Sequence, residues 1–420
     1  MPDKEPVAVI GSGISGLTAA WLLSRRYEVH LFEASETIGG HTNTEHIEAG
    51  GATWPVNTGF IVYNDWTYPN FIRLMNELGV DSAPSSMSFS VQSSASGLEY
   101  NGTSLDALFA QRRNLINPRF LTMIREIMRF NRISREALAG DELTADRTLG
   151  DFLDQSRFSA YFRRHYIIPM GAAIWSAPET ELQAFPARFF LRFFNNHGML
   201  SIHERPRWRV ISGGSAVYID PMLVPLEDRV YRGTPISSIQ RHPDHVTVRS
   251  ARGEERFGQV IIATHSDQAL NLLADATDAE RRILGALPYR ENDVVLHTDT
   301  GVLPRNRRAW AAWNYHIPRN PQEAVSVTYN MNILQNLRDA PETFCVTLNR
   351  DHDIETARVI KRFRYAHPSF TREGVAAQDS YERIGGQHRT HYCGAYWFNG
   401  FHEDGVRSAL RVAKALGVDW

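Results

Sequence analysis

The chain has 420 residues, of which 43% are hydrophobic and 22% charged, and its formal net charge is −2. At ~150 residues per domain this length corresponds to two or three domains, which excludes a peptide or a small disulfide scaffold, and a net charge near zero gives no reason to expect a nucleic-acid partner. The two cysteines, Cys345 and Cys393, are too few for a disulfide framework or a four-ligand zinc site, so we expect no metal site and assign any redox chemistry to a bound cofactor.

The N-terminal residues predict a strand, a turn, a helix and a second strand. Residues 7–10 form a short apolar run typical of a strand buried in a parallel sheet, and a glycine-rich turn follows it. Residues 17–26 have helical composition, and residues 29–33 form the second strand. This order is that of a βαβ unit. With few residues before it and no apolar run of the ~18 residues that a membrane span needs, we expect a cytoplasmic protein.

The rest of the chain predicts mixed helices and strands. Helices are expected over 66–80, 105–138, much of 150–200 and from 405 onward; strands are expected within 87–100, 208–211, 234–241, 245–250, 259–263, 292–299, 324–329 and 341–348. The predicted fold class is α/β, with a Rossmann-like nucleotide-binding domain and a discontinuous α+β second domain. The expected boundaries are 1–60, 205–285 and 385–420 for the first domain and 61–204 and 286–384 for the second.

Gly11, Gly13 and Gly16 form the pattern G-x-G-x-x-G between the first strand and the helix, and Glu33 ends the second strand. The glycines allow a tight turn, a close approach to a pyrophosphate, and close packing of helix on strand. The helix N-terminus favours phosphate, and Glu33 can accept hydrogen bonds from ribose hydroxyls. The same carboxylate would repel a 2′-phosphate, so the motif predicts a dinucleotide other than NADP.

The segment from Val7 to Ser35, followed by Ile38-Gly39-Gly40-His41-Thr42, resembles the amine oxidase and phytoene desaturase group of FAD-dependent enzymes. The resemblance implies FAD, held by a Rossmann-like FAD-binding domain of the glutathione reductase type next to a discontinuous α+β substrate domain. The second glycine pair would cover the FAD phosphates, and His41 stands where the group has arginine. Two later segments, 56–60 and 394–409, are similar to the group's flavin contacts, with Asn57 where aspartate is commoner. The implied cofactor-binding residues are Gly11, Gly13, Ile14, Ser15, Gly16, Glu33, Ala34, Gly39, Gly40, His41, Thr42, Asn57, Thr58, Gly59, Phe60, Ile236, Ala263, Thr264, Gly394, Glu403, Asp404, Gly405, Val406 and Ser408.

Three residues are candidates for catalysis. Many amine oxidases hold a water near the flavin with a lysine on a substrate-domain strand, and His297 lies near that position here. Histidine can transfer protons near neutral pH, although a histidine without a special role at a strand end is the alternative. By motif position Tyr396 and Trp397 are expected beside the flavin, where aromatic walls suit an apolar substrate as well as an amine.

Arginine is concentrated in one predicted helical stretch. All basic residues except Lys4, Lys361 and Lys414 are arginine, and residues 112–135 hold seven of them against one acid, Glu126. Such a helix can lie on an anionic membrane with its apolar face down, or it can pack on its own core. The phenylalanines of 185–194 likewise fit either a core or the wall of an acyl tunnel.

The strings 41–44 and 400–405 resemble a bacterial family of FAD-binding, amine-oxidase-like proteins, within the phytoene desaturase and protoporphyrinogen oxidase superfamily, encoded beside cyclopropane-fatty-acid-synthase-like methyltransferases. The resemblance implies an FAD-dependent oxidoreductase that desaturates unsaturated or methylated acyl chains of membrane phospholipids, as in furan fatty acid formation. Its expected partners are a lipid or other apolar substrate, the inner membrane surface and a methyltransferase. A flavin amine oxidase and a redox-neutral acyl-chain isomerase are the alternatives.

Overall fold

The computed structural model describes residues 4–140, 143–144, 146–319 and 325–420. The structure has two halves, each assembled from several segments of the chain. The first, the nucleotide-binding half, is built around a five-stranded parallel sheet in the order β10-β2-β1-β14-β20. These strands are β1 (Pro6–Ile10), β2 (Glu28–Phe32), β10 (Val230–Tyr231), β14 (Gln259–Ile262) and β20 (Thr390–Tyr392). Helix α1 (Ile14–Leu23) connects β1 to β2, as predicted, and the C-terminal helix α15 (His402–Ala415) packs on it.

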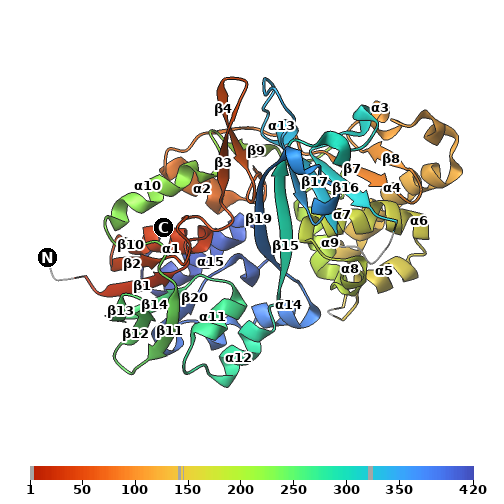
Figure 1. Cartoon of the computed structure of the whole chain (residues 1–420). Coiled ribbons are helices and arrows are strands. Elements are labelled where there is room, and N and C mark those ends of the chain that lie inside the picture. The colour runs from red at the N-terminus through yellow and green to blue at the C-terminus, as the bar shows by residue number, and fades with distance from the viewer. Residues whose placement is uncertain (1–3, 141–142, 145, 320–324) are drawn as a thin grey trace.

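Smaller elements surround the parallel sheet (Figure 1). An antiparallel sheet consists of β11 (Ile236–Arg241), β12 (Val246–Ser250) and β13 (Gly253–Phe257). A second small sheet consists of β5 (Tyr63–Asn64), β9 (Trp208–Ile211) and β6 (Ser82–Pro84). The helices of this half are α2 (Pro69–Glu77), α10 (Ile219–Leu223), α11 (Ser266–Leu272) and α12 (Asp278–Gly285). Because α2 packs on α15 and its Phe71 lies in the core of this half, residues 63–84 belong with the nucleotide-binding half, beyond the boundary expected at residue 60.

The second half contains a seven-stranded sheet in the order β19-β15-β18-β17-β16-β7-β8. Its strands are β7 (Phe89–Ser93), β8 (Glu99–Asn101), β15 (Tyr289–His297), β16 (Trp313–Ile317), β17 (Ser326–Asn330), β18 (Cys345–Leu348) and β19 (Val359–Pro368). All pairs are antiparallel except β16 with β7. The hairpin β3 (Thr44–Ala49) and β4 (Ala52–Asn57), short helix α13 (Met331–Leu334) and helix α14 (Arg372–Gln378) complete this region.

A helical layer covers one end of the seven-stranded sheet, at the right of Figure 1. It comprises α3 (Leu105–Leu108), α4 (Pro118–Ala139), α5 (Leu149–Gln155), α6 (Ala160–Phe162), α7 (Ile168–Trp175), α8 (Glu179–Ala184) and α9 (Ala187–Asn196). Phe120, Met123 and Phe130 of α4 are fully buried, as are Phe190 and Phe194 of α9. The apolar face of α4 therefore packs on the protein's own core and does not lie on a membrane. The phenylalanines of 185–194 likewise belong largely to the core rather than to the wall of a tunnel.

The predicted α/β class is confirmed. No helix within the described ranges is both long and apolar enough to cross a membrane.

Strand β19 was not predicted: its sequence alternates poorly because it is an edge strand, with charged side chains such as Arg362 and Arg364 exposed.

Candidate functional site

The glycine-rich turn between β1 and α1 has the geometry that phosphate binding requires. Gly11 has φ of +99°, and its N–H donates to the Phe32 carbonyl at 2.8 Å. A Cβ at Gly16 would lie 1.9 Å from the Gly11 carbonyl oxygen, so only glycine fits there. A Cβ at Gly13 would meet no atom within 4 Å. The space in front of the α1 N-terminus is thus open, and an anion can be accommodated there.

The second glycine pair lies against this turn. Gly40 has φ of +59°, and a Cβ on it would lie 3.1 Å from the Gly13 Cα. The Gly39 N–H donates to Ser12 Oγ at 3.1 Å, and Ser12 in turn donates through its N–H and Oγ to Glu33 at 2.9 and 2.6 Å. The structure therefore brings the two glycine turns and Glu33 together at the ends of β1 and β2, with Ala34 directly after the carboxylate.

The adenine side of the predicted cradle follows from the parallel sheet. Ala263 donates to the Ile10 carbonyl at 2.8 Å, so it and Thr264 continue β14 beside the glycine turn. The Thr234 N–H donates to the Glu33 carbonyl at 2.8 Å, which places the start of β11, with Ile236, next to Glu33.

The start of helix α15 closes the cradle from the C-terminal side. A Cβ at Gly405 would lie 2.6 Å from Ile14 Cγ2 and 2.9 Å from Ser15 Oγ, so the helix start lies directly on α1. Ser408 Oγ accepts from the Gly394 N–H at 2.9 Å, and Val406 is fully buried. Asp404 accepts from the Phe401 and Asn399 N–H groups at 3.0 and 3.2 Å, while burial raises its pKa to about 6.

Glu403 does not face the cradle. Its carboxylate accepts from the Asn70 side chain at 2.6 Å and from the Phe71 N–H at 2.9 Å, both at the start of α2. The side chain therefore ties α15 to α2, since a carboxylate at a helix N-terminus is favourable. This differs from the cofactor contact that the motif implied for Glu403.

The segment 57–60 forms the wall between the two halves. A Cβ at Gly59 would lie 2.1 Å from the His41 carbonyl oxygen, and the Phe60 ring stacks on His402 at 3.6 Å between centroids. His402 Nε2 lies 3.0 Å from Thr42 Oγ1, and Thr58 Oγ1 lies 2.9 Å from the Tyr365 hydroxyl.

The residues present fit FAD. Asn57 Oδ1 accepts from Thr44 Oγ1 at 2.9 Å and from the Ser215 N–H at 2.8 Å, yet Asn57 Nδ2 and His41 Nε2 are buried without a partner in the described structure. Both atoms belong to the segments beside the glycine turns, where a bound ligand could supply their hydrogen-bond partners. Together with the open space at Gly13 and the N-termini of α1 and α15, they match a long polar cofactor with a diphosphate.

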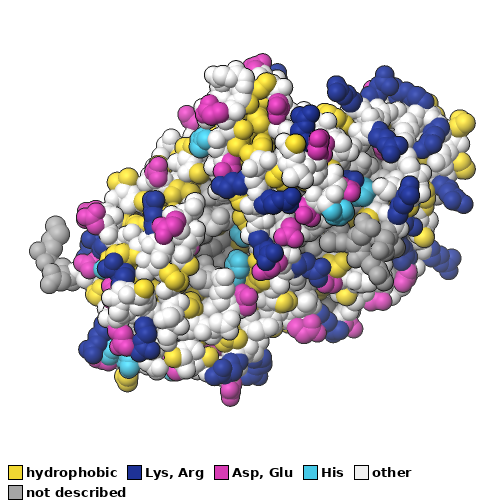
Figure 2. Space-filling view, viewed as in Figure 1, with side chains coloured by type: hydrophobic (Ala, Val, Ile, Leu, Met, Phe, Trp, Pro, Cys, Tyr) yellow, Lys and Arg dark blue, Asp and Glu magenta, His cyan; other side chains and the backbone are white. Residues whose placement is uncertain are grey.

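Three histidines that are far apart in the sequence, His41, His265 and His367, meet where β15 begins and β19 ends. The His41 ring centroid lies 5.5 Å from His367 and 6.2 Å from His265. Tyr365 lies 5.1 Å from His41, and Tyr289 stacks on His265 at 4.0 Å. In Figure 2 histidine side chains are visible in the hollow between the two halves of the molecule. We call His41, His265, His367, Tyr289 and Tyr365 the cleft cluster.

The cleft cluster is electrically neutral at pH 7. Burial and the neighbouring histidines lower the pKa of His41 to about 3 and that of His367 to about 4, and burial also lowers the pKa of His265. Burial raises the pKa of both tyrosines. The sequence did not predict His265, His367 or the two tyrosines as site residues because they come from three separate segments. The only related signal was His41, a histidine where the group has arginine.

His367 is held in place from the substrate-domain side. Its Nδ1 lies 3.1 Å from Ser176 Oγ and 3.4 Å from Asn292 Nδ2. Ser176, which ends α7, has φ of +51°, a conformation that serine rarely adopts. The strained residue thus positions the hydroxyl group against the imidazole.

The structure does not bring His297 to this site. His297 lies at the opposite end of β15, where its side chain is 0% exposed. Its Nε2 lies 2.7 Å from Thr347 Oγ1, and its Nδ1 accepts from the Asp299 N–H at 3.1 Å. With both ring nitrogens engaged inside the sheet, His297 is a structural residue, which corrects the catalytic assignment.

Tyr396 and Trp397 are also core residues rather than cleft walls. Both are 1% exposed and pack in one cluster with Tyr392 and Tyr381. Tyr396 contacts the cleft cluster through an edge-to-face contact with Tyr289, with 6.3 Å between ring centroids. The motif placed them correctly in the chain, but their rings turn into the nucleotide-binding half.

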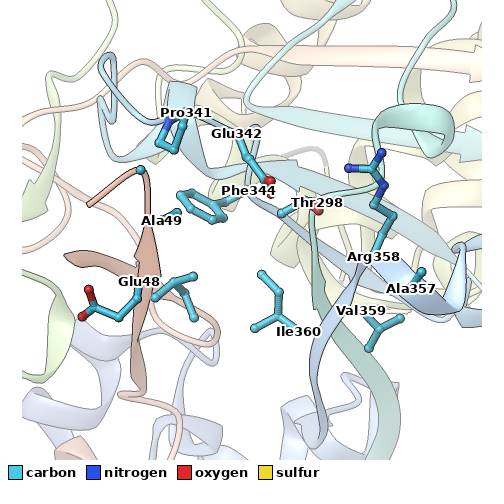
Figure 3. A pocket seen from close by; sticks show the side chains of 12 residues that line it. Glu48, Ala49, Thr298, Pro341, Glu342, Phe344, Ala357, Arg358, Val359 and Ile360 are labelled. Carbon is cyan, nitrogen blue, oxygen red and sulfur yellow. The ribbon is translucent and has the colours of Figure 1, made fainter. Parts of the chain in front are cut away.

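Two hollows lie away from the cleft cluster. One, of about 550 Å³, lies between hairpin β3–β4 and the end of the sheet near His297 (Figure 3), with Phe344, Val359 and Ile360 among apolar side chains and Glu48, Glu342 and Arg358 among charged ones. The other, of about 390 Å³, lies beside the starts of α2 and α15 and includes Trp66, Phe193 and Phe401. No three His, Cys, Asp or Glu side chains among the described residues are arranged to hold a metal ion.

A model of a known protein family matches most of the chain. The model for flavin containing amine oxidoreductases matches residues 14–328, three quarters of the chain. The chain belongs to this family. Its expected cofactor, FAD, and its class, FAD-dependent oxidoreductase, are thereby confirmed. The glycine turns, Glu33 and the start of α15 stay the predicted FAD-binding residues.

Relatives and solved structures agree with this family. The chain is 26% identical over 278 residues to a putative flavin-containing monoamine oxidase of Mycobacterium tuberculosis and 22% identical over 277 residues to an L-amino acid dehydrogenase of Synechocystis. It spans only a little over half the length of these relatives, 57% and 55%.

Solved structures with the same fold cover nearly the whole chain. Cyclohexylamine oxidase from Brevibacterium oxydans aligns with a TM-score of 0.69 at 16% identity, covering 98% of both chains. A fatty acid isomerase from P. acnes that produces conjugated linoleic acid aligns with a TM-score of 0.67 at 14% identity, again over 98% of both chains. At these identities the likeness establishes the fold.

Proposed function

We propose that the protein is an FAD-dependent dehydrogenase that introduces a double bond into an unsaturated or methylated fatty acyl chain of a membrane phospholipid. The observation that carries the proposal is the neutral, aromatic character of the cleft cluster. Its histidines have lowered and its tyrosines raised pKa values, so none of the five side chains is charged at pH 7. A site without charged side chains accommodates an uncharged, apolar substrate.

The lysines support the same choice. All three are exposed and lie away from the cleft cluster, and Lys361 forms an ion pair with Glu45 at 2.8 Å. None of them can take the role of the water-holding lysine that many amine oxidases use. This departure weighs against amine oxidation, the second candidate.

We assign to His367 the role of catalytic base that the sequence suggested for His297. Bound FAD supplies the acceptor for a hydride. We assign the ring proton to Nδ1, which donates it to Ser176 Oγ, the nearer of the two groups at that nitrogen (3.1 Å, against 3.4 Å for Asn292 Nδ2). The His367 Nε2 lone pair is then free to accept the proton that leaves the substrate carbon. The substrate thereby loses one proton and one hydride, the hydride carries away both electrons of the two-electron oxidation, and a carbon–carbon double bond forms. His41, next to the second glycine turn, serves the cofactor instead.

One solved structure with the same fold, the P. acnes protein named above, is a fatty acid isomerase. That likeness supports an acyl substrate, and it makes a redox-neutral acyl-chain isomerase the alternative function. A methyltransferase partner stays a prediction.

The test is anaerobic mixing of the FAD-loaded protein with a phospholipid that carries a methylated unsaturated chain. We expect the absorbance of oxidised flavin to bleach, with one new double bond per reduced flavin by mass spectrometry. Phospholipid with saturated chains is the matched control and leaves the flavin oxidised.

Two results would overturn the proposal. Rapid bleaching by a primary amine, with none by the lipid, would make the protein an amine oxidase. A shift of the double bond without bleaching would make it an isomerase.

A further inference from the structure

Helix α4 presents a strongly basic face to solvent. Its apolar side chains pack inward, so Arg119, Arg125 and Arg132 are exposed, and the arginines of the preceding 3-10 helix (Arg112–Ile116) are exposed with them. Figure 2 shows Lys and Arg side chains gathered over this part of the molecule, at the upper right. The clustering seen in the sequence is thus a surface in three dimensions.

Few carboxylates neutralise this face. Arg112 pairs with Asp106 and Arg132 with Glu136, and Arg308 lies 3.6 Å from the same Asp106. Arg113, Arg119 and Arg125 form no ion pair with any carboxylate in the described ranges. The sole acid within 112–135, Glu126, is buried; it accepts from the Ser159 N–H at 2.8 Å and pairs with Arg129 at 3.6 Å, so it is not available to Arg113, Arg119 or Arg125. The face therefore keeps an unneutralised positive charge.

An apolar tip projects from the middle of these arginines. Ile116 is 86% exposed and Leu115 is 52% exposed, although both are large hydrophobic residues. They end the 3-10 helix, between Arg113 and Arg119 in the chain, and are held there by the Asn117 cap and Pro118 at the start of α4. Hydrophobic side chains lie at the right edge of Figure 2 beside the arginines. Adjacent exposed apolar residues within a charged rim mark a contact site.

We infer that the Leu115–Ile116 tip and the arginines around it form the surface by which the protein docks on an anionic phospholipid bilayer. The arginines match lipid phosphates, with which guanidinium groups form bidentate hydrogen bonds, and the tip reaches the acyl boundary below the headgroups. A nucleic acid would satisfy the arginines but leave Leu115 and Ile116 in water. A bilayer takes both, and the contact does not depend on which substrate the cleft accepts.

The contact differs from an amphipathic helix lying in the membrane. The apolar face of α4 stays in the protein core, so binding requires no unfolding and buries only two side chains. Affinity then depends mainly on charge, and it should fall steeply as salt screens the arginines.

The experiment is flotation of the full FAD-loaded chain with vesicles of phosphatidylcholine alone or mixed with phosphatidylglycerol. We expect recovery with the anionic vesicles only, reduced by about tenfold in Arg119→Glu/Arg125→Glu and in Leu115→Asp/Ile116→Asp. Arg281→Glu/Arg282→Glu, the same charge change on α12, is the matched control and should bind like the parent. Arg119→Lys/Arg125→Lys should retain most binding.

A second readout follows the tip itself and needs no turnover. Because Cys345 and Cys393 are both buried, Ile116→Cys carries the one accessible thiol among the described residues and can be labelled with a polarity-sensitive dye. We expect a blue shift on addition of anionic vesicles. Equal flotation with both vesicle types, equal loss in the α12 control, tighter binding to single-stranded RNA than to vesicles, or a dye that stays in water would overturn the inference.

Discussion

The two ends of the strand pair β15–β19 have similar residues but opposite characters. At one end His297 lies inside the sheet with both ring nitrogens bonded to Thr347 and Asp299. At the other end His367 has one nitrogen held by Ser176 and faces His41 across the cleft. Burial lowers the pKa of both histidines to about 4. The lowered pKa therefore does not distinguish the two histidines; the hydrogen bonds do, because both ring nitrogens of His297 are engaged and only Nδ1 of His367 is.

The largest expected effect of this contrast is on turnover. We expect His367→Gln to lower the rate of flavin reduction by the lipid by about 100-fold, since general base catalysis contributes ~10²–10⁴-fold. His297→Gln should stay within a few-fold of the parent. Stopped-flow reduction, together with FAD content and the pH profile, checks this. A His297 variant as slow as the His367 variant would reverse the assignment.

The opposite order is expected for stability. His297→Ala leaves a buried cavity and removes the acceptor of the Asp299 N–H, so the free energy of unfolding should fall by about 1–3 kcal/mol. His367→Ala, at the partly exposed end, should cost less than that. Urea unfolding of both variants at one FAD concentration measures the difference, with m-values confirming that the same transition is followed.

Acidification should sharpen the contrast further. His297 binds its proton at about pH 4 when folded but near pH 6.5 when unfolded, so its contribution to stability is complete above pH 6.5 and is lost as the pH falls toward 4. Between pH 7 and pH 5 we expect a loss of about 1–2 kcal/mol from this fully buried group. His297→Gln should flatten that part of the pH dependence in urea titrations; an unchanged slope would mean that the ring is already charged in the fold.

The smallest effect is expected at His41, which faces His367 but serves the cofactor. His41→Arg restores the residue that the group usually has and should slow FAD release by a few-fold, because a guanidinium pairs with a diphosphate more strongly than a neutral imidazole. The rise of flavin fluorescence after dilution measures release. Faster release than from the parent would show that the arginine cannot be accommodated beside His265.

Local motifs predicted the nucleotide-binding half well. The pattern from Gly11 to Gly16 is a short-range feature whose chemistry depends on backbone geometry within a few residues, and the structure has the strand, turn, helix and Glu33 where the sequence placed them. The helix that begins at His402 and the strands of 236–262 were predicted for the same reason.

Long-range packing explains what was missed or misplaced. Strand β19 has ten residues with several charges and no clear alternation, so only its pairing with β15 makes it a strand. Glu403 faces α2 because that helix start needs a carboxylate, which no motif records. Tyr396 and Trp397 lie correctly along the chain, but the rotation of their rings depends on neighbours such as Tyr381.

The sequence by itself determined the family, the cofactor and the concentration of arginine in one helix, because these depend on residue types at fixed short spacings. The tertiary structure decided which histidine faces the cleft, which face of α4 meets water, and that Leu115 and Ile116 project beside the arginines. These properties depend on pairing and packing between segments up to hundreds of residues apart, and the energy of burying a side chain exists only once those segments meet.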